Sequence, residues 1–247
     1  MILEPADALA IIRGTSSENT VLVGGQAVML WAAYFGIHPS QASLTADVDY
    51  LGKTSEAKRL SARLKLPHRI ALPGMDDATP NTAVLSIRLP GYPDPVIVDY
   101  LSGVAGIETG AVEKAAVTID HRGVRVRVMH PIHCLKSKLS NLHLLQSKRS
   151  PEGIEQARLA TRIAAAFLEM AIDQWDDVRA ILKAIESVAA IAQSKAAVYC
   201  LRRFDVDCGH ALPEKKIAAP RLPARFLDQR WPRLRSAVER KLAPARG

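Results

Sequence analysis

The chain has 247 residues, 48% of them hydrophobic, which is enough apolar material to bury the core of one α/β domain with a helical extension. The formal net charge is +8, and the excess of lysine and arginine is concentrated near the C-terminus. No apolar run approaches the ~20 residues of a bilayer-spanning helix, so the composition argues against a membrane protein.

The N-terminal residues and the cysteines both indicate a cytoplasmic location. The segment from Met1 to Pro5 lacks the basic start and the apolar core of a secretory signal. Cys134, Cys200 and Cys208 form a sparse and odd-numbered set that fits a reducing compartment better than a disulfide framework.

A glycine pair follows the first predicted strand. A short helix is expected from Glu4 through Ile12, stopped by Gly14. Val21 to Val23 is then a predicted strand that runs into Gly24 and Gly25, with a helix from Gln26 to Phe35. Backbone N–H groups at a glycine turn that opens a helix are suited to binding phosphate, because the helix dipole favours an anion there.

Two carboxylates separated by one apolar residue come next. Asp47 and Asp49 flank Val48 on a predicted strand, so both carboxylates project to one side while Val48 faces the core. Neighbouring carboxylates repel each other unless a cation lies between them, and Mg²⁺ prefers one or two carboxylates together with phosphate oxygens. This pair is therefore a candidate metal site.

A third acid lies on a later strand. A helix is predicted over Ser55 to Leu64, and strands are predicted over His68 to Leu72, Ala83 to Leu89 and Val96 to Leu101. Asp99 interrupts the β-branched residues of the last of these strands. A buried charge requires a partner, so Asp99 is expected to complete the metal site.

A hairpin and then helices are predicted for the second half of the chain. The hairpin pairs Val117 to Asp120 with Val124 to Met129. After Pro131 the apolar spacing becomes helical, and a long helix is expected from Glu152 to Met170. Lys136 and Lys138 are both on the helix after Pro131.

These features resemble the nucleotidyltransferase superfamily, most closely its AbiEii-type, toxin-like branch. The residues that carry the resemblance are Gly24, Gly25, Asp47, Asp49 and Asp99. The resemblance implies a small mixed sheet with flanking helices, on which the three acids bind two Mg²⁺ ions, or Mn²⁺, and an NTP. It also implies that Gly24, Gly25 and either Lys136 or Lys138 contact the triphosphate, and the sequence leaves the choice of lysine open.

Three departures accompany the resemblance. Gly25 stands where the superfamily often has serine, so no hydroxyl is offered to the phosphates. An extra loop around Gly36 to Ser40 lengthens the interval before Asp47. Some relatives carry a further acid after the basic helix, whereas this segment supplies only Glu152 and Glu155.

The sequence thus predicts an α/β nucleotidyltransferase-like core over residues 1–149 and a helical region with a basic tail over residues 150–247. The predicted activity is Mg²⁺-dependent transfer of a nucleoside monophosphate from an NTP to a hydroxyl of RNA such as tRNA, of a protein or of a small molecule, in a toxin-like role. The alternatives are a degenerate relative that binds nucleotide, RNA or a protein partner without catalysis, and an antitoxin-type or partner-binding module. A toxin-like protein would in turn have an antitoxin protein as its partner.

The basic tail is an additional candidate for contact with nucleic-acid phosphates. Its eight basic residues are Arg221, Arg225, Arg230, Arg233, Arg235, Arg240, Lys241 and Arg246. A solvated helix face is the alternative interpretation. Phe226, Leu227, Trp231 and Leu234 recur at near-helical spacing, so the tail is also expected to pack on the body of the protein.

Overall fold

Seven strands form one mixed sheet in the computed structural model, which describes residues 3–74, 76–219 and 221–246. The strand order is β3-β4-β5-β2-β1-β7-β6. The pairs β1–β7 and β2–β5 are parallel, and the other neighbouring pairs are antiparallel. The strands are β1 (Val21–Val23), β2 (Val48–Leu51), β3 (His68–Ala71), β4 (Asn81–Ile87), β5 (Val96–Leu101), β6 (Val117–His121) and β7 (Val124–Val128).

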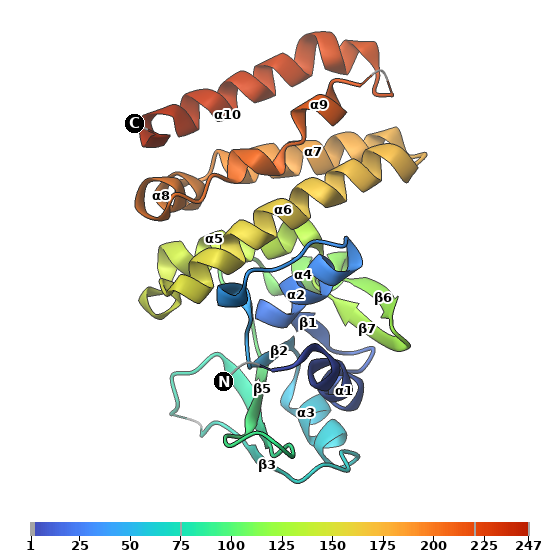
Figure 1. The fold of residues 1–247 in the computed structure, drawn as a ribbon, viewed down its shortest axis with the longest axis vertical. Helices are drawn as coiled ribbons and strands as arrows, with labels where there is room; N and C mark the ends of the chain where they lie inside the picture. Colours follow the sequence, from blue (N-terminus) through green and yellow to red (C-terminus); the bar gives the residue numbers. More distant parts are fainter. Residues whose placement is uncertain (1–2, 75, 220, 247) are drawn as a thin grey trace.

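Among the described residues, four helices accompany the sheet, and a helical region is stacked on the sheet at one end (Figure 1). Helix α2 follows β1 without a linker and contacts β1 and β2 as well as two helices of the next region. The helices of the sheet region are α1 (Pro5–Thr15), α2 (Gly24–Tyr34), α3 (Thr54–Ser61) and α4 (Thr109–Ala115).

The second half of the chain is helical. Its α-helices are α5 (Pro131–Leu144), α6 (Pro151–Gln174), α7 (Val178–Ala192), α8 (Lys195–Phe204), α9 (Glu214–Ile217) and α10 (Trp231–Arg246). Short 3-10 segments are η1 (Gln41–Ser43), η2 (Gln146–Lys148) and η3 (Cys208–Ala211), and a π-helical turn η4 (Phe226–Arg230) precedes α10. The predicted fold class, a mixed α/β core with a C-terminal helical region, is confirmed.

Two hydrophobic clusters make up the core, and α6 contributes to both of them. Leu159 and Ile163 of α6 pack with the sheet, whereas Phe167 and Leu168 of the same helix pack within the helical cluster. Helix α5 places Leu135 in the helical cluster too. One continuous helix therefore joins the two parts, and the domain boundary at residue 150 stays a prediction.

Most predicted elements are present with bounds that differ by no more than four residues, but two expectations about helices differ from the structure. Gly14 does not stop the first helix, because α1 continues to Thr15. Thr15 is fully buried and its hydroxyl donates to the Ile11 carbonyl at 2.8 Å, so tertiary burial outweighs the glycine. Helix α4 was not predicted; it begins where the Glu108 side chain accepts hydrogen bonds from two backbone N–H groups.

The tail packs on the body as predicted, since Phe226 and Trp231 are buried in the helical cluster. Cys134, Cys200 and Cys208 are buried and free. In the described part of the chain, no helix combines the length and the apolar character that crossing a membrane demands.

Candidate functional site

A cavity of about 590 Å³ lies where the sheet meets α5 and α6. Its walls come from the junction of β1 with the first residues of α2, from β2 and β5, and from the start of α6. The predicted site residues that line it are Gly24, Gly25, Asp47, Asp49, Asp99 and Lys138. Segments far apart in the sequence thus contribute to one cavity.

Strand pairing accounts for the position of the two inner acids. Asp49 on β2 is directly opposite Asp99 on the parallel strand β5, and Val23 lies opposite Asp49 on the other side. Side chains in register on adjacent strands point to the same face. Val48 is fully buried, as its predicted inward orientation requires. Asp47 was predicted to lie on the same strand, but β2 begins at Val48, so Asp47 is an exposed residue that precedes the strand and lines the same cavity.

The acids are electrostatically coupled. Burial raises the pKa of Asp49, while Lys138 and Lys148 oppose this shift. Burial, together with the charges of Asp49 and Asp47, raises the pKa of Asp99 to about 6. In the protein without a cation, negative charge at this position is therefore disfavoured, which is the electrostatic condition that a bound cation relieves.

The glycine pair is required by close packing around Asp49. Gly24 has a φ of +65°, and a Cβ atom there would lie 1.8 Å from Asp49 Oδ2. A Cβ atom on Gly25 would lie 2.5 Å from the Thr45 side chain and 2.8 Å from Gln156 Nε2. The Gly25 backbone N–H acts on the Asp49 carboxylate and lowers its pKa against the effect of burial. The turn thus supports a site carboxylate, and its contact with phosphate stays a prediction.

The two candidate lysines face different cavities. Lys138 is 6% exposed, lines the cavity that contains the acids and has a pKa lowered by burial to about 8. Lys136 is exposed and lines a separate cavity with His133 and Ser187. The structure thus brings Lys138, and not Lys136, together with Asp49 and Asp99.

Three further polar residues in the cavity were not predicted. Asn81, at the start of β4, donates through its Nδ2 to Asp99 Oδ1 at 3.0 Å. Lys148, in η2, lines the cavity, and its positive charge lowers the pKa of both Asp49 and Asp99 against the effect of burial. Gln156 on α6 accepts a hydrogen bond from Lys138 Nζ. The i, i+4 spacing of Glu152 and Gln156 was the one sequence signal for the last of these, whereas Asn81 and Lys148 depend on tertiary packing.

A metal ion at this site would need further ligands from a bound substrate. Within residues 3–74, 76–219 and 221–246, no group of three or more His, Cys, Asp or Glu side chains is arranged so that it could hold a metal ion by itself. Mg²⁺ in phosphate-transferring proteins is usually held by one or two carboxylates together with substrate phosphates. The charge of Asp49 disfavours the charged form of Asp99, and both residues line an open cavity, so they fit that kind of site. The assignment of Asp47, Asp49 and Asp99 as metal ligands stays a prediction.

Comparisons with known proteins give distant similarities. No protein-family model and no curated protein matches the sequence. An antigenic nucleotidyltransferase-like protein from Paracoccidioides brasiliensis has a crystal structure that is similar over 74% of this chain and 95% of its own, with 13% identity and a TM-score of 0.45. A putative nucleotidyltransferase from H. pylori is similar over 96% of this chain and 92% of its own, with 12% identity and a TM-score of 0.35.

Proposed function

We propose that this protein is a metal-dependent nucleotidyltransferase that moves a nucleoside monophosphate from an NTP to an acceptor hydroxyl. The observation that carries the proposal is the register of β2 and β5, which sets Asp49 beside Asp99 in a cavity that Lys138 also lines. Carboxylates for a divalent cation and a lysine for phosphate are the groups that phosphoryl transfer uses.

Each residue has a distinct role in this proposal. Asp47, Asp49 and Asp99 would hold two Mg²⁺ ions, which when bound would neutralise phosphate charge and lower the pKa of the acceptor hydroxyl. Lys138 contacts the triphosphate, with Gly24 and Gly25 beside it. Asp99, with one oxygen held by Asn81, would accept the proton of the acceptor hydroxyl. In-line attack on the α-phosphate then forms the new phosphodiester bond and releases pyrophosphate.

The test is a transfer assay with a matched inactive control. The purified protein and an Asp49→Asn variant are incubated with each α-labelled NTP, Mg²⁺ and total cellular RNA or lysate. Label in RNA or protein, with stoichiometric pyrophosphate, is expected for the original sequence alone. Pyrophosphate release that is equal in the Asp49→Asn variant would contradict the proposal.

Binding without catalysis is the second candidate function. It is favoured by the absence, in the described residues, of a ready-made group of three metal-binding side chains. It is also favoured by the lack of a matching acid near residue 156, since some relatives of the suspected family carry an acid shortly after the basic helix. In that case nucleotide or RNA binds with no Mg²⁺-dependent pyrophosphate release, so the same assay separates the two functions.

For the acceptor, we propose RNA, on the strength of the net charge of +8. We also propose a cytoplasmic, toxin-like role controlled by an antitoxin protein. Expression that arrests growth in the original sequence but not in the Asp49→Asn variant would support this role. Equal growth of the two strains would contradict it.

A further inference from the structure

One glutamine connects three parts of the site. Gln156 is 4% exposed and belongs to α6, outside the sheet region. Its Oε1 accepts from Lys138 Nζ at 2.5 Å, and its Nε2 donates to Glu152 Oε1 at 2.9 Å and to the Ser43 carbonyl at 3.3 Å. The same amide nitrogen would be 2.8 Å from a Cβ atom on Gly25. The Gln156 side chain therefore contacts Lys138 on α5, the segment before Asp47, and the glycine pair at the start of α2.

Only a side-chain amide satisfies all of these partners. The carbonyl oxygen of Gln156 faces an ammonium group, and its NH₂ group faces two acceptors, so the orientation of the amide is determined. A carboxylate at residue 156 would bring a second negative charge against Glu152 and the Ser43 carbonyl. An apolar side chain would leave the buried Lys138 without its partner, which is costly.

The neutral partner leaves the charge of Lys138 available to a ligand. Among the described residues, Lys138 donates no other side-chain hydrogen bond, so two of its three N–H bonds remain for the cavity. Lys138 and Asp49 attract each other electrostatically, but no ion pair joins them among the described residues. An ion-paired lysine would instead be largely neutralised by its partner.

We infer that Gln156 is a positioning residue, which holds the Lys138 ammonium so that it meets the phosphates of a triphosphate bound beside Asp49 and Asp99. This inference rests on the proposed function for the identity of the ligand. It gives the helical region a direct part in the site, because α6 supplies the group that orients a lysine on α5.

The test is a double-mutant cycle on the full chain, read by calorimetric binding of inorganic triphosphate with Mg²⁺. Gln156→Leu is expected to weaken binding about tenfold, the scale of a lost hydrogen bond to a charged group. Lys138→Met should weaken binding at least as much, and Gln156→Leu should add nothing in the Lys138→Met background, since it acts through that lysine.

Gln26→Leu is the matched control. Gln26 is also buried and donates to the Thr45 carbonyl at 3.1 Å, close to the same segment, but it makes no hydrogen bond with Lys138. Its removal should leave triphosphate affinity unchanged. Thermal unfolding of every variant separates loss of fold from loss of binding.

Gln156→Glu keeps the test decisive if Gln156→Leu fails to fold. The carboxylate retains a bond to Lys138 but neutralises it, so triphosphate binding should again fall about tenfold. Three outcomes would overturn the inference. The first is unchanged triphosphate affinity in a folded Gln156 variant, and the second is additive effects of the two substitutions in the cycle. The third is no triphosphate binding by the original sequence. Triphosphate binding with a non-additive cycle but no nucleotidyl transfer would overturn the proposed reaction and leave the positioning role intact.

Discussion

Asp99 combines burial with the charge of two neighbouring acids, and its raised pKa predicts an unusual pH dependence. Its pKa is about 6 in the folded protein, against an ordinary value of 3.8. Folding therefore favours the protonated form, so this residue stabilises the metal-free protein below about pH 4 and the contribution is lost as the pH rises through 6.

Urea unfolding in a chelator, at pH 7 and at pH 5, measures this contribution by comparing the original sequence with Asp99→Asn. The variant should be the more stable protein at pH 7, and the difference should shrink at pH 5. The comparison is needed because the pKa of His130 is lowered by burial to about 4, which destabilises the fold on acidification. A difference that does not change with pH would show that Asp99 does not titrate in this range.

Gly24 is constrained by its backbone conformation and by the contact with Asp49, and these two constraints can be separated. Gly36 has nearly the same φ, +66°, but a Cβ atom there would meet nothing within 4 Å. Gly36→Ala should therefore cost only the conformational strain, roughly 1–2 kcal/mol of unfolding free energy, and keep Mg²⁺-nucleotide binding. Gly24→Ala should cost more and abolish that binding, because the methyl group displaces the Asp49 carboxylate. Unfolding free energy is measured by denaturation and Mg²⁺-nucleotide affinity by calorimetry. Equal losses of both quantities in the two variants would mean that the contact between Gly24 and Asp49 is unimportant.

At the scale of elements, β5 was predicted with its observed limits, since apolar β-branched residues surround a single charge. The pairing of β5 with β2 could not be predicted, because β3 and β4 intervene in the sequence and register depends on the whole sheet. The sequence therefore identified the three acids as candidate metal ligands, but it did not show that Asp49 and Asp99 lie opposite each other on adjacent strands. Asn81 was missed for the same reason, since its role depends on β4 lying beside β5.

Helix α5 presents its two candidate lysines to different surroundings. Residues two positions apart on a helix are roughly 200° apart around its axis, so Lys136 and Lys138 cannot both face the acids. The sequence could not decide between them, because which face of α5 meets the sheet is set by packing. Lys138→Met is expected to weaken Mg²⁺-triphosphate binding at least tenfold, and Lys136→Met to leave it unchanged. Calorimetry on both variants tests this assignment, and a larger loss for Lys136→Met would reverse it.

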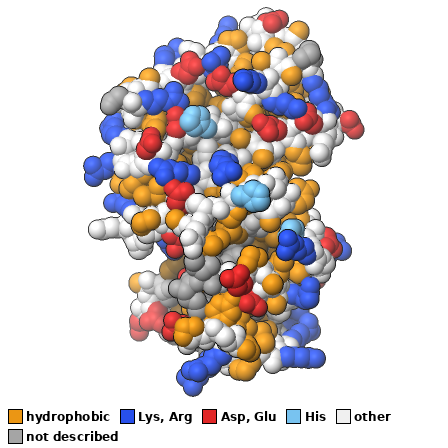
Figure 2. All heavy atoms as spheres, in the orientation of Figure 1, with side chains coloured by type: hydrophobic (Ala, Val, Ile, Leu, Met, Phe, Trp, Pro, Cys, Tyr) orange, Lys and Arg blue, Asp and Glu red, His pale blue; other side chains and the backbone are white. Residues whose placement is uncertain are grey.

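At the scale of the whole molecule, the basic tail is largely a structural element. Arg230 pairs with Glu186 at 2.9 Å, Arg235 pairs with Glu214 at 2.9 Å, and Arg246 pairs with Asp207 at 2.7 Å. Figure 2 shows acidic side chains interspersed among basic ones over the helical region on the face drawn. The tail is therefore not a uniformly positive surface, and deleting it would also remove Phe226 and Trp231 from the core.

The remaining tail charges can still be tested for RNA contact without disturbing the fold. Arg233, Arg240 and Lys241 are exposed and form no ion pair with another described residue. If they contact RNA, reversing all three to Glu should weaken binding and flatten the slope of log K against log salt by roughly 0.7 per lost phosphate contact.

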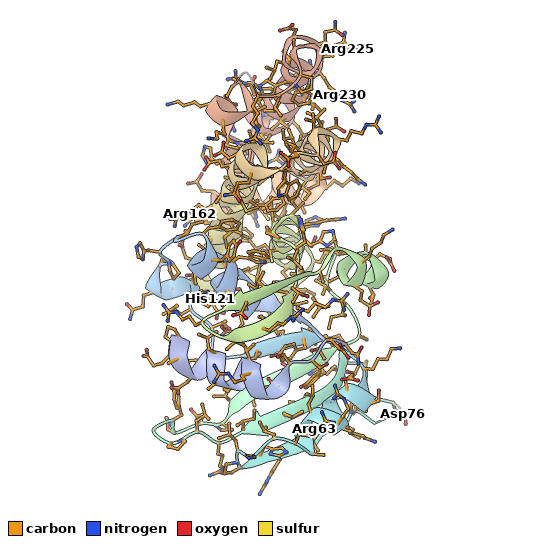
Figure 3. The ribbon with its side chains drawn as sticks, turned by 90° about the vertical axis from the view of Figure 1, so that its right-hand side faces the viewer. Arg63, Asp76, His121, Arg162, Arg225 and Arg230 are labelled. Carbon is orange, nitrogen blue, oxygen red and sulfur yellow. The ribbon has the colours of Figure 1, made fainter. Side chains whose placement is uncertain are left out.

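The control for this charge reversal lies at the other end of the molecule, where Figure 3 places Arg63 opposite Arg225 and Arg230. Reversing Arg63, Lys65 and Arg69 to Glu changes the net charge by the same amount, so a purely global charge effect would weaken RNA binding equally in both triple variants. A flatter salt slope for the tail variant alone, measured by filter binding or anisotropy, would place RNA on α10. Equal slopes in the two variants would exclude these tail residues as phosphate contacts, and the acceptor would then have to approach the cavity between β5 and α5 without passing over the tail.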